Sequence, residues 1–315
     1  MESLDMKLYT NIKSYSVTWL ANTYDQSSSQ GIIANYYLPE TMEEMTELCR
    51  DLYDRKEKFY VVGSTSNIYI RPNTNIEHLI SVKLLHQFYV EDDFMYCECG
   101  ASVKQIVRKM VKDGMKGYSC MIDLPGTVGG AIYGNASVST DSIVQQLVDV
   151  KILLKDGVIK TFTPEELNFS FRSSSLKRKE LNGIILSCRL KRIKGDQKKI
   201  EDEAQMVHAW RKANQPGAAR NLGTTSLLSI TNRTMLGMAL RCLTSFVGMF
   251  VPSKKRNDVK IKMIMTWLGK PGLAKYLFGL NRYMWLDSAA HLCFDDYVEV
   301  INQLYVKPRL EIEVW

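Results

Sequence analysis

Strands are predicted where short apolar runs end at polar turns. Residues 59–62 form one such run, and a polar turn at 63–67 separates it from a second run at 68–70. Residues 148–157 alternate apolar and polar side chains and end in an Asp-Gly pair, which is typical of a hairpin turn. A further alternating segment, 310–314, ends the chain. We expect a strand in each of these apolar or alternating segments.

Helices are predicted where apolar residues recur every three or four positions. Residues 41–52 show this period, with Thr41 suited to cap the first turn and Glu44 in the capping-box position. Residues 103–110 and 295–304 show the same period. Because helices and strands are mixed along the chain, the pattern predicts an α+β fold.

Two turns combine glycines with small polar residues. The first is Gly63-Ser-Thr-Ser-Asn67, and the second runs from Asp123 through Leu-Pro-Gly-Thr-Val-Gly-Gly-Ala-Ile-Tyr-Gly-Asn to Ala136. A backbone that lies against a diphosphate cannot carry a Cβ atom at every contact, and its N–H groups can face the anion. Either turn alone could be a tight turn without a ligand. Together, about sixty residues apart, they indicate a site for a large dinucleotide.

These turns resemble those with which the UDP-N-acetylenolpyruvoylglucosamine reductase (MurB) family holds FAD. The second turn matches the family's Pro-Gly-Thr-Val-Gly-Gly-Ala loop, whereas Ser64 and Thr65 stand where the family's first turn has glycines. The resemblance implies a two-lobed FAD-binding domain of the vanillyl-alcohol-oxidase (PCMH) type, followed by a smaller α+β substrate domain. It also implies non-covalent FAD, held by Gly63, Ser64, Thr65, Ser66, Asn67, Pro125, Gly126, Thr127, Val128, Gly129, Gly130 and Asn135.

Three further segments resemble those that carry the family's catalytic residues. The Phe-Ser-Phe-Arg segment that ends at Arg172 is similar to the family's Tyr-Arg-x-Ser, whose arginine lies beside the flavin and the substrate. Thr224 follows an Arg-x-x-x-Gln-Pro segment, which begins at Arg211, at the spacing of the family's proton-donating serine. The C-terminal Leu-Glu-Ile-Glu-Val resembles the family's Leu-Glu-Pro-Glu-Val, and Glu313 is the matching acid.

The reaction implied by the resemblance is a hydride transfer. NADPH would reduce the flavin, and the hydride would pass to the enolpyruvyl ether of a nucleotide sugar, as in the formation of UDP-N-acetylmuramate. Arg172 would stabilise the charge that develops on the enolate. Thr224 would protonate the α carbon, and Glu313 would share a proton with the enolic acid or orient a water.

Other interpretations stay open. Arg172 could pair with Glu165 or Glu166, and Glu313 could share a solvated strand face with Glu311. Because Leu-Leu-Ser-Ile replaces the family's Phe-Lys-Asn-Pro, the chain could be a paralogue that acts on another sugar for surface polysaccharide synthesis. It could also be a non-catalytic flavin-binding or membrane-recruited module.

Length and composition favour a multi-part cytoplasmic enzyme. With 315 residues the chain exceeds what one hydrophobic core usually serves, and we expect lobes at 1–83 and 84–195 and a substrate domain at 196–315, separated by the charged run 191–199. An odd cysteine count and the absence of a secretory leader favour a reducing compartment. No histidines or cysteines have the spacing of metal ligands, and we predict no metal site.

Residues 233–282 form a basic, apolar insertion relative to the family. They contain ten Lys or Arg residues and one acid, Asp258, whereas the whole chain has a formal net charge of +7. Residues 234–251 are almost continuously apolar around Arg241. A transmembrane span, a peripheral contact with the inner face of the membrane, and a helical elaboration with a basic face for an anionic ligand are the alternatives. No base-stacking or groove-reading motif accompanies the charges, so we do not expect nucleic acid binding.

Overall fold

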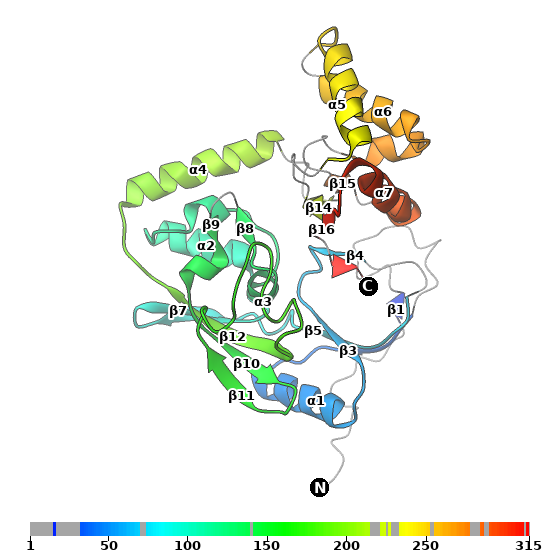
Figure 1. Cartoon of the computed structure of the whole chain (residues 1–315). Coiled ribbons are helices and arrows are strands. Elements are labelled where there is room, and N and C mark those ends of the chain that lie inside the picture. Colours follow the sequence, from blue (N-terminus) through cyan, green and yellow to red (C-terminus); the bar gives the residue numbers. More distant parts are fainter. Residues whose placement is uncertain are drawn as a thin grey trace. The chain divides into compact units, whose positions relative to one another are not determined.

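A computed structural model describes most of the chain, namely residues 15–16, 32–69, 74–138, 141–214, 221–224, 226–227, 233–252, 255–277, 284–286, 290–311 and 313–314. The chain divides into two compact units (Figure 1). The first comprises Met1–Tyr15, Ile32–Ser66 and Asn75–Gln215, and the second comprises Ser16–Gly31, Asn67–Thr74 and Pro216–Trp315. Each unit has its own apolar core.

The first unit contains a small sheet whose main strands are parallel. The strand order is β1 (Tyr15–Ser16), β2 (Ile32–Tyr37), β5 (Ile76–Ser81) and β3 (Phe59–Val62). Parallel strands require a crossover connection, and α1 (Met42–Asp54) provides one between β2 and β3. The predicted N-cap is confirmed, because the Thr41 hydroxyl accepts a hydrogen bond from the Glu44 amide at 3.1 Å.

The same unit contains a larger antiparallel sheet. Its order is β11 (Ile159–Phe162), β10 (Leu147–Leu154), β12 (Gly183–Lys191), β7 (Phe94–Glu98) and β6 (Phe88–Glu91). The predicted hairpin is confirmed, with Val150 opposite Phe162 and Gly157 in the turn at φ +80°. A two-residue pair, β8 (Ser137–Val138) with β9 (Asp141–Ser142), lies between this unit's helices in the chain.

Helices accompany the larger sheet. They are α2 (Val103–Lys112), α3 (Val128–Tyr133) and α4 (Gln197–Asn214), with short 3-10 turns η3 (Ser119–Met121) and η4 (Ile143–Gln146). One continuous apolar core runs from the small sheet, at Tyr37 and Ile80, through α2 to the larger sheet at Ile152 and Leu186. Residues from both expected lobes therefore share one core. The helix α4 starts inside the expected boundary region 191–199 and belongs to the first unit.

The second unit is mainly helical in its described part. Its helices are α5 (Met235–Gly248), α6 (Arg256–Trp267), the 3-10 helix η8 (Pro271–Tyr276) and α7 (Ala290–Leu304), which contains the helix predicted at 295–304. Short strands pair as β13 (Asn221–Thr224) with β15 (Met284–Leu286), β14 (Ser226–Leu227) with β16 (Arg309–Leu310), and β17 (Glu313–Val314) with β4 (Ile68–Tyr69). Within the described ranges, no helix combines the length and the hydropathy needed to cross a membrane.

Candidate active site

The first glycine turn leaves β3 and passes directly over the second. Gly63 has no room for a side chain, because a Cβ there would lie 2.1 Å from the Thr127 hydroxyl oxygen. Thr65 adopts the left-handed conformation at φ +51°, which is costly for a β-branched residue. Ser66 reaches the second turn, since its hydroxyl oxygen would be 3.1 Å from a Cβ placed on Gly126. Two turns that are far apart in the sequence therefore contact each other in the first unit.

The second turn is fastened to the larger sheet by its own backbone. The Val128 amide donates to the Ala101 carbonyl at 2.9 Å, and the Gly129 amide donates to the Cys99 carbonyl at 2.8 Å. The Thr127 hydroxyl accepts from the Gly130 amide at 3.4 Å, so these amides are used inside the protein. This differs from the expectation that the glycine amides face an anion, because carbonyls of the turn that follows β7 accept hydrogen bonds from the Val128 and Gly129 amides.

Two neighbouring glycines of this turn have different surroundings. A Cβ on Gly129 would be 3.0 Å from the Cys99 carbonyl oxygen, so this glycine permits close packing on the sheet. Gly130 is exposed, and a Cβ there would meet only the Thr127 hydroxyl at an ordinary 3.4 Å. Gly126 is required for the turn itself, with φ at +107°. The open side of the turn is therefore at Gly130.

Arg172 lies at the tip of a tight hairpin. Ser170 and Ser173 exchange backbone hydrogen bonds of 3.0 Å, which leaves Phe171 and Arg172 as the two tip residues. Arg172 is half-buried and left-handed at φ +55°, and such strain is concentrated at functional sites. The two backbone hydrogen bonds between Ser170 and Ser173 therefore fix the conformation of the hairpin that carries Arg172.

The Arg172 hairpin is anchored to the end of α3. The Asn135 side-chain amide donates to the Ser170 carbonyl at 2.7 Å, and the Ser174 hydroxyl donates to the Tyr133 carbonyl at 2.7 Å. Asn135 is buried and left-handed at φ +45°. In the described structure Asn135 therefore joins the second glycine turn, through α3, to the predicted catalytic hairpin.

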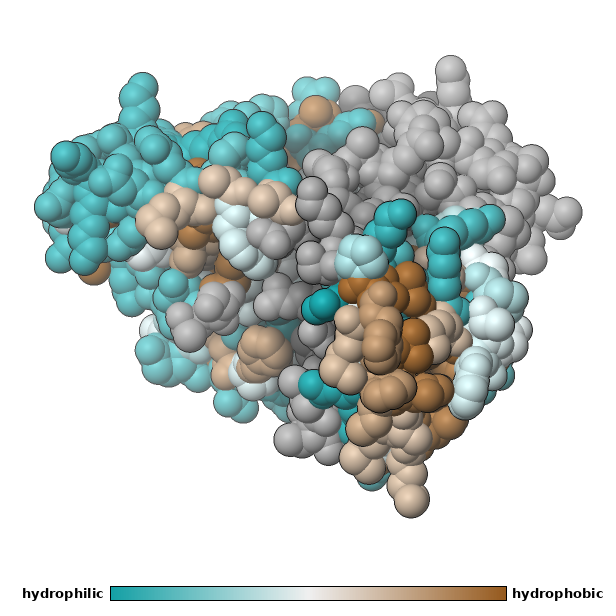
Figure 2. All heavy atoms as spheres, turned by 90° about the horizontal axis from the view of Figure 1, so that it is seen from above, coloured by the Kyte–Doolittle hydropathy of each residue, from teal (hydrophilic) through white to brown (hydrophobic). Residues whose placement is uncertain are grey.

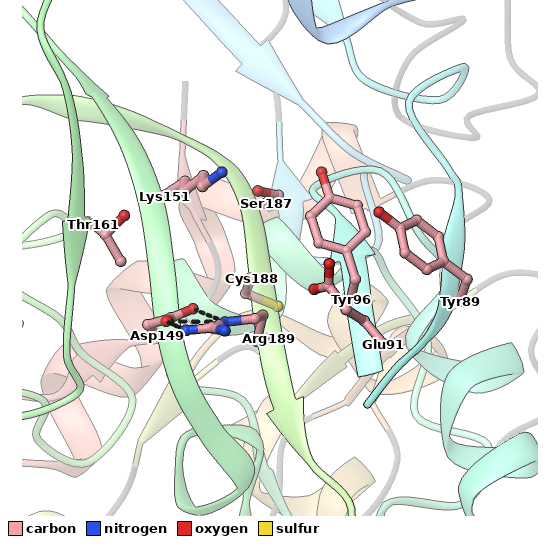
Figure 3. A pocket seen from close by; sticks show the side chains of 9 residues that line it. All are labelled: Tyr89, Glu91, Tyr96, Asp149, Lys151, Thr161, Ser187, Cys188 and Arg189. Carbon is pink, nitrogen blue, oxygen red and sulfur yellow. Dashed lines mark hydrogen bonds and ion pairs between the residues drawn. The ribbon is translucent and has the colours of Figure 1, made fainter. Parts of the chain in front are cut away.

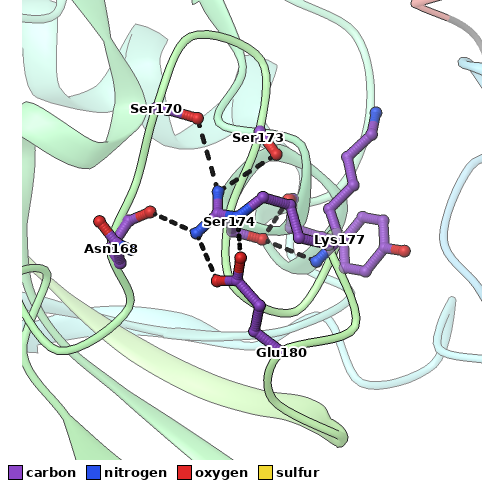
Figure 4. A network of polar contacts seen from close by, with 8 residues as sticks. Asn168, Ser170, Ser173, Ser174, Lys177 and Glu180 are labelled. Carbon is purple, nitrogen blue, oxygen red and sulfur yellow. Dashed lines mark hydrogen bonds and ion pairs between the residues drawn. The ribbon is translucent and has the colours of Figure 1, made fainter.

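A second arginine, Arg178, bonds to this hairpin, and Figure 4 shows the polar groups of Asn168, Ser170, Ser173 and Glu180 gathered around its guanidinium. Its guanidinium donates to the Asn168 carbonyl at 2.8 Å and to the hydroxyls of Ser170 and Ser173 at 3.4 and 3.3 Å. The Glu180 carboxylate pairs with it at 2.8 Å. The sequence prediction did not include Arg178, because nothing in a Ser-Ser-Ser-Leu-Lys-Arg segment indicates which cation turns inward.

Helix α4 is tied to the start of the second turn by charged groups. Asp123 bonds to Arg108 at 2.7 Å and to His208 of α4 at 2.5 Å. Burial alone would raise the pKa of Asp123, but the hydrogen bonds from His208 and Arg108 hold it below its usual value.

One turn further along α4, burial lowers the pKa of half-buried Arg211. The Arg211 Nε atom is buried and finds no hydrogen-bond acceptor among the described residues, which makes Arg211 a candidate anion ligand.

The other two predicted catalytic residues lie in the second unit. Glu313 is half-buried in β17, and its amide donates to the Asn67 carbonyl at 3.0 Å. The Asn67 side chain donates to the carbonyl of Glu311, which is itself buried at 9% exposure. Glu311 and Glu313 therefore do not share a freely solvated strand face. Asn67 of the first turn lies next to Glu313.

Thr224 ends β13, where its backbone pairs with Met284. The following strand pairs Ser226 with Leu310, on the segment that leads to Glu313. The side chain of Thr224 lies outside the described structure. Because Arg172 belongs to the first unit and Thr224 and Glu313 to the second, a common site for the three remains a prediction.

A pocket of about 480 Å³ lies on the larger sheet, away from these residues in the sequence (Figure 3). Asp149 and Arg189, which line it, form an ion pair, and Tyr89 and Tyr96 stack beside them with ring centroids 4.8 Å apart. None of the predicted site residues lines this pocket. Because it shares no lining residue with the predicted set, it does not enlarge the candidate site.

Comparison with known proteins agrees with the glycine turns. A family model for an FAD binding domain matches residues 33–163. UDP-N-acetylenolpyruvoylglucosamine reductase of Bacillus pumilus (strain SAFR-032) is 29% identical over 189 residues, which cover 57% of this chain and 59% of the relative. The enzyme of that name from Latilactobacillus sakei subsp. sakei (strain 23K) is 29% identical over 179 residues, covering 57% and 58%. The chain therefore matches less than two thirds of the length of these curated relatives.

The fold is similar over nearly the whole chain to that of one solved structure. UDP-N-acetylenolpyruvylglucosamine reductase (MurB) from Thermus caldophilus superimposes with a TM-score of 0.69 at 18% identity, covering 98% of this chain and 100% of that one. The predicted fold, an FAD-binding domain of the PCMH type followed by a smaller α+β domain, is confirmed. In sequence and in fold, the chain is similar to proteins of the UDP-N-acetylenolpyruvoylglucosamine reductase (MurB) family.

Proposed function

We propose that the chain is an FAD-dependent reductase that takes hydride from NADPH and delivers it to the enolpyruvyl ether of a nucleotide sugar, forming a product of the UDP-N-acetylmuramate type. The observation that carries the proposal is the contact between the two glycine turns, at Gly63 with Thr127 and at Gly126 with Ser66. The anchoring of the Arg172 hairpin to α3 adds a fixed cation within the same unit. The relatives from Bacillus and Latilactobacillus are named as reductases of UDP-N-acetylenolpyruvoylglucosamine, which supports the proposed substrate class.

The residues of the turns fit a bound dinucleotide in two different ways. Exposed Ser64, Pro125 and Gly130 are positioned to contact it, because no protein group occupies the space where a Gly130 side chain would lie. Buried Thr127 and Val128 would act by shaping the turn, since their polar groups are bonded within the protein. Half-buried Ser66 and exposed Asn67 are further predicted contacts, and half-buried Arg211 is added to them as a candidate anion ligand.

Bound FAD would supply the redox chemistry, taking hydride from NADPH and passing it to the β carbon of the enolpyruvyl group. The Arg172 guanidinium would meet the negative charge that then develops on the substrate's enolate and carboxylate. Thr224 would donate its hydroxyl proton to the α carbon and recover a proton from solvent, which balances the reduction of the double bond. Glu313 would hold a shared proton at the substrate acid or orient a water at this position.

The proposal is tested by following the two half-reactions separately. Under anaerobic conditions, NADPH should bleach the flavin absorption of the purified protein, and UDP-N-acetylglucosamine enolpyruvate should then restore it. Bleaching by NADPH without recovery by this substrate would favour the paralogue that acts on another sugar. A protein that takes up FAD but is not reduced by NADPH or NADH would instead favour a non-catalytic flavin-binding module.

A further inference from the structure

Helix α5 exposes its large apolar side chains and buries its small residues. The buried positions are Gly237, Leu240, Thr244 and Gly248, of which only Leu240 is large and apolar. The exposed positions on α5 and just beyond it include large apolar residues with exposures from 37% to 85%. We call six of these the α5 apolar face, namely Met235, Met238, Leu243, Phe246, Met249 and Phe250.

This arrangement is the reverse of an ordinary surface helix, which turns its large apolar residues to the core. Close packing explains the small ones: a Cβ on Gly237 would lie 2.2 Å from the Leu304 carbonyl oxygen, and one on Gly248 would lie 2.8 Å from Lys260 Cε. Thr234 caps the helix at the Gly237 amide and also donates to a carbonyl near the end of α7 at 2.6 Å. These contacts hold α5 without using the apolar face, so the face is available to a partner.

The residues around the α5 apolar face are cationic. Arg241 is exposed on α5 itself, and Lys255, Arg256 and Lys262 are exposed on α6 and at its start. Between residues 233 and 277 the sequence contains a single acid, Asp258. Figure 2, coloured by hydropathy, shows a continuous brown area with teal side chains along its upper border and paler residues beside it. An apolar strip with a basic border is complementary to an anionic interface.

The neighbouring helix α7 carries three acids, of which Asp295 is exposed and two are paired with a lysine. Asp296 and Glu299 both bond to Lys270, at 2.5 and 2.8 Å. Trp267, at the C-terminal end of α6, is 68% exposed. Tryptophan is enriched at the level of lipid headgroups, where its ring is partly in the apolar phase and its N–H remains in contact with water.

We propose that the α5 apolar face docks on the surface of an anionic phospholipid bilayer. The helix would lie in the plane of the interface, with its phenylalanines and methionines among the upper acyl chains and its neighbouring cations beside lipid phosphates. A helix of 14 residues is about 21 Å long, which suits surface attachment and is too short to span the hydrocarbon. This inference does not depend on the proposed reductase activity, because it rests on residues that have no role in it.

Charge and composition favour a bilayer over other partners. A second copy of the chain would bring two cationic surfaces together, and like charges at close range oppose association. A nucleic acid would meet the cations but leave the phenylalanines and methionines exposed to water. Only an anionic lipid surface offers both phosphate groups and an apolar layer directly beneath them.

The test is flotation of the full-length protein with lipid vesicles. The protein should float with vesicles of phosphatidylcholine mixed with phosphatidylglycerol, float poorly with phosphatidylcholine alone, and dissociate as salt is raised. The double variant Phe246→Ser/Phe250→Ser should lose vesicle binding by more than roughly tenfold, because the two side chains supply much of the buried apolar area. The double variant Lys255→Glu/Lys262→Glu should weaken binding by at least about fivefold per residue and reduce its dependence on salt.

The matched control is Val158→Ser/Ile159→Ser, which removes two exposed apolar side chains from the turn of the β10–β11 hairpin. It should float like the unchanged protein. All variants alter exposed side chains, so unchanged thermal unfolding would show that loss of flotation is not loss of folding. Absence of flotation with phosphatidylglycerol vesicles, or equal flotation of the phenylalanine variant, would overturn the proposal. So would a dimer that the phenylalanine variant disrupts while no vesicle binding is seen, since the partner would then be a second copy.

Discussion

Two adjacent glycines of the second turn have different roles. Gly129 is required for packing of the protein, whereas Gly130 is free to contact a ligand. At Gly129 the sheet leaves no space, because the Cys99 carbonyl oxygen lies 3.0 Å from the position of a Cβ. At Gly130 the nearest protein atom is at an ordinary contact distance of 3.4 Å and the residue is exposed. A side chain added at Gly130 would therefore test contact with FAD rather than the packing of the protein.

We predict that Gly130→Val weakens FAD binding by more than roughly tenfold while the melting temperature of the apoprotein changes little, because the added methyl groups occupy ligand space. FAD affinity can be measured by titrating apoprotein and following flavin fluorescence. The matched control is Gly134→Val, four residues on, where the nearest atom to a new Cβ is the Gly130 carbonyl oxygen at 3.5 Å. Equal affinities in the Gly130 variant and the unchanged protein would refute the placement of FAD at this turn.

Thr224 is expected to act in only one of the two half-reactions. Thr224→Val keeps the shape of the side chain but removes the proton, so reduction of the flavin by NADPH should stay unchanged. Its reoxidation by the enolpyruvyl substrate should slow by about 10²- to 10⁴-fold. Stopped-flow absorbance measures both rates, and Thr225→Val, one residue further on, serves as the control. If both half-reactions slow equally in Thr224→Val, this residue is not the specific proton donor.

The hairpin that carries Arg172 shows how one element depends on its neighbours. The resemblance predicted Arg172 from its local segment, but its supports come from elsewhere: Asn135 at the end of α3, Ser174, and the inward guanidinium of Arg178. These partners are identified only by the folded backbone, because no periodic pattern links them in the sequence. The position of Arg172 is therefore a property of the whole hairpin.

Replacing Arg178 with methionine should lower the rate of the substrate half-reaction more than it lowers FAD affinity. The reason is that methionine keeps most of the apolar stem but loses the bonds to Asn168, Ser170 and Ser173 that define the hairpin. Rapid-reaction kinetics and flavin titration give the two quantities. Lys179→Met removes a cation from the next, exposed position and should have little effect. Equal activity of the two variants would mean that Arg178 does not position Arg172.

The attachment of α4 should depend on pH through Asp123. Because its pKa is lower in the folded protein than in the unfolded chain, its bonds to His208 and Arg108 stabilise the protein above the usual carboxyl range. This stabilisation is lost as the pH falls through the lowered folded value. Urea unfolding should therefore find Asp123→Asn less stable than the unchanged protein at neutral pH, with the difference shrinking as the pH falls below the usual carboxyl range. A difference that persists in acid would contradict the ionic origin of the contact.

In the whole molecule, strongly periodic segments were predictable and weakly patterned ones were not. The helix capped by Thr41 and the hairpin around Gly157 follow from local residue types alone. The charged run 191–199 predicts a linker where helix α4 begins, because few of the helix's described side chains are buried, namely Ile200 and Ala204, and its bond to Asp123 is polar. Local sequence cannot show such a contact, since the partner, Asp123, lies 85 residues away.

The candidate site was predictable to the extent that glycine is irreplaceable. Gly63 and Gly126 lie where the two turns contact each other. A side chain at either position would be too close to the other turn, so glycine is required there and the motif contains it. The roles of Val128 and Gly129 were less predictable, because their amides donate to carbonyls in the turn that follows β7. The reverse amphipathicity of α5 was also hidden, since an apolar run does not indicate whether its small or its large residues face the core.

The central claim is that the first unit holds FAD between its two glycine turns, and the most direct measurement is the absorption spectrum of the purified, undialysed protein. The account predicts flavin bands in the visible region and the release of FAD, identified by chromatography, on acid treatment. Apoprotein should regain the same spectrum when FAD is added back. A folded but colourless protein that takes up no added FAD would contradict the account.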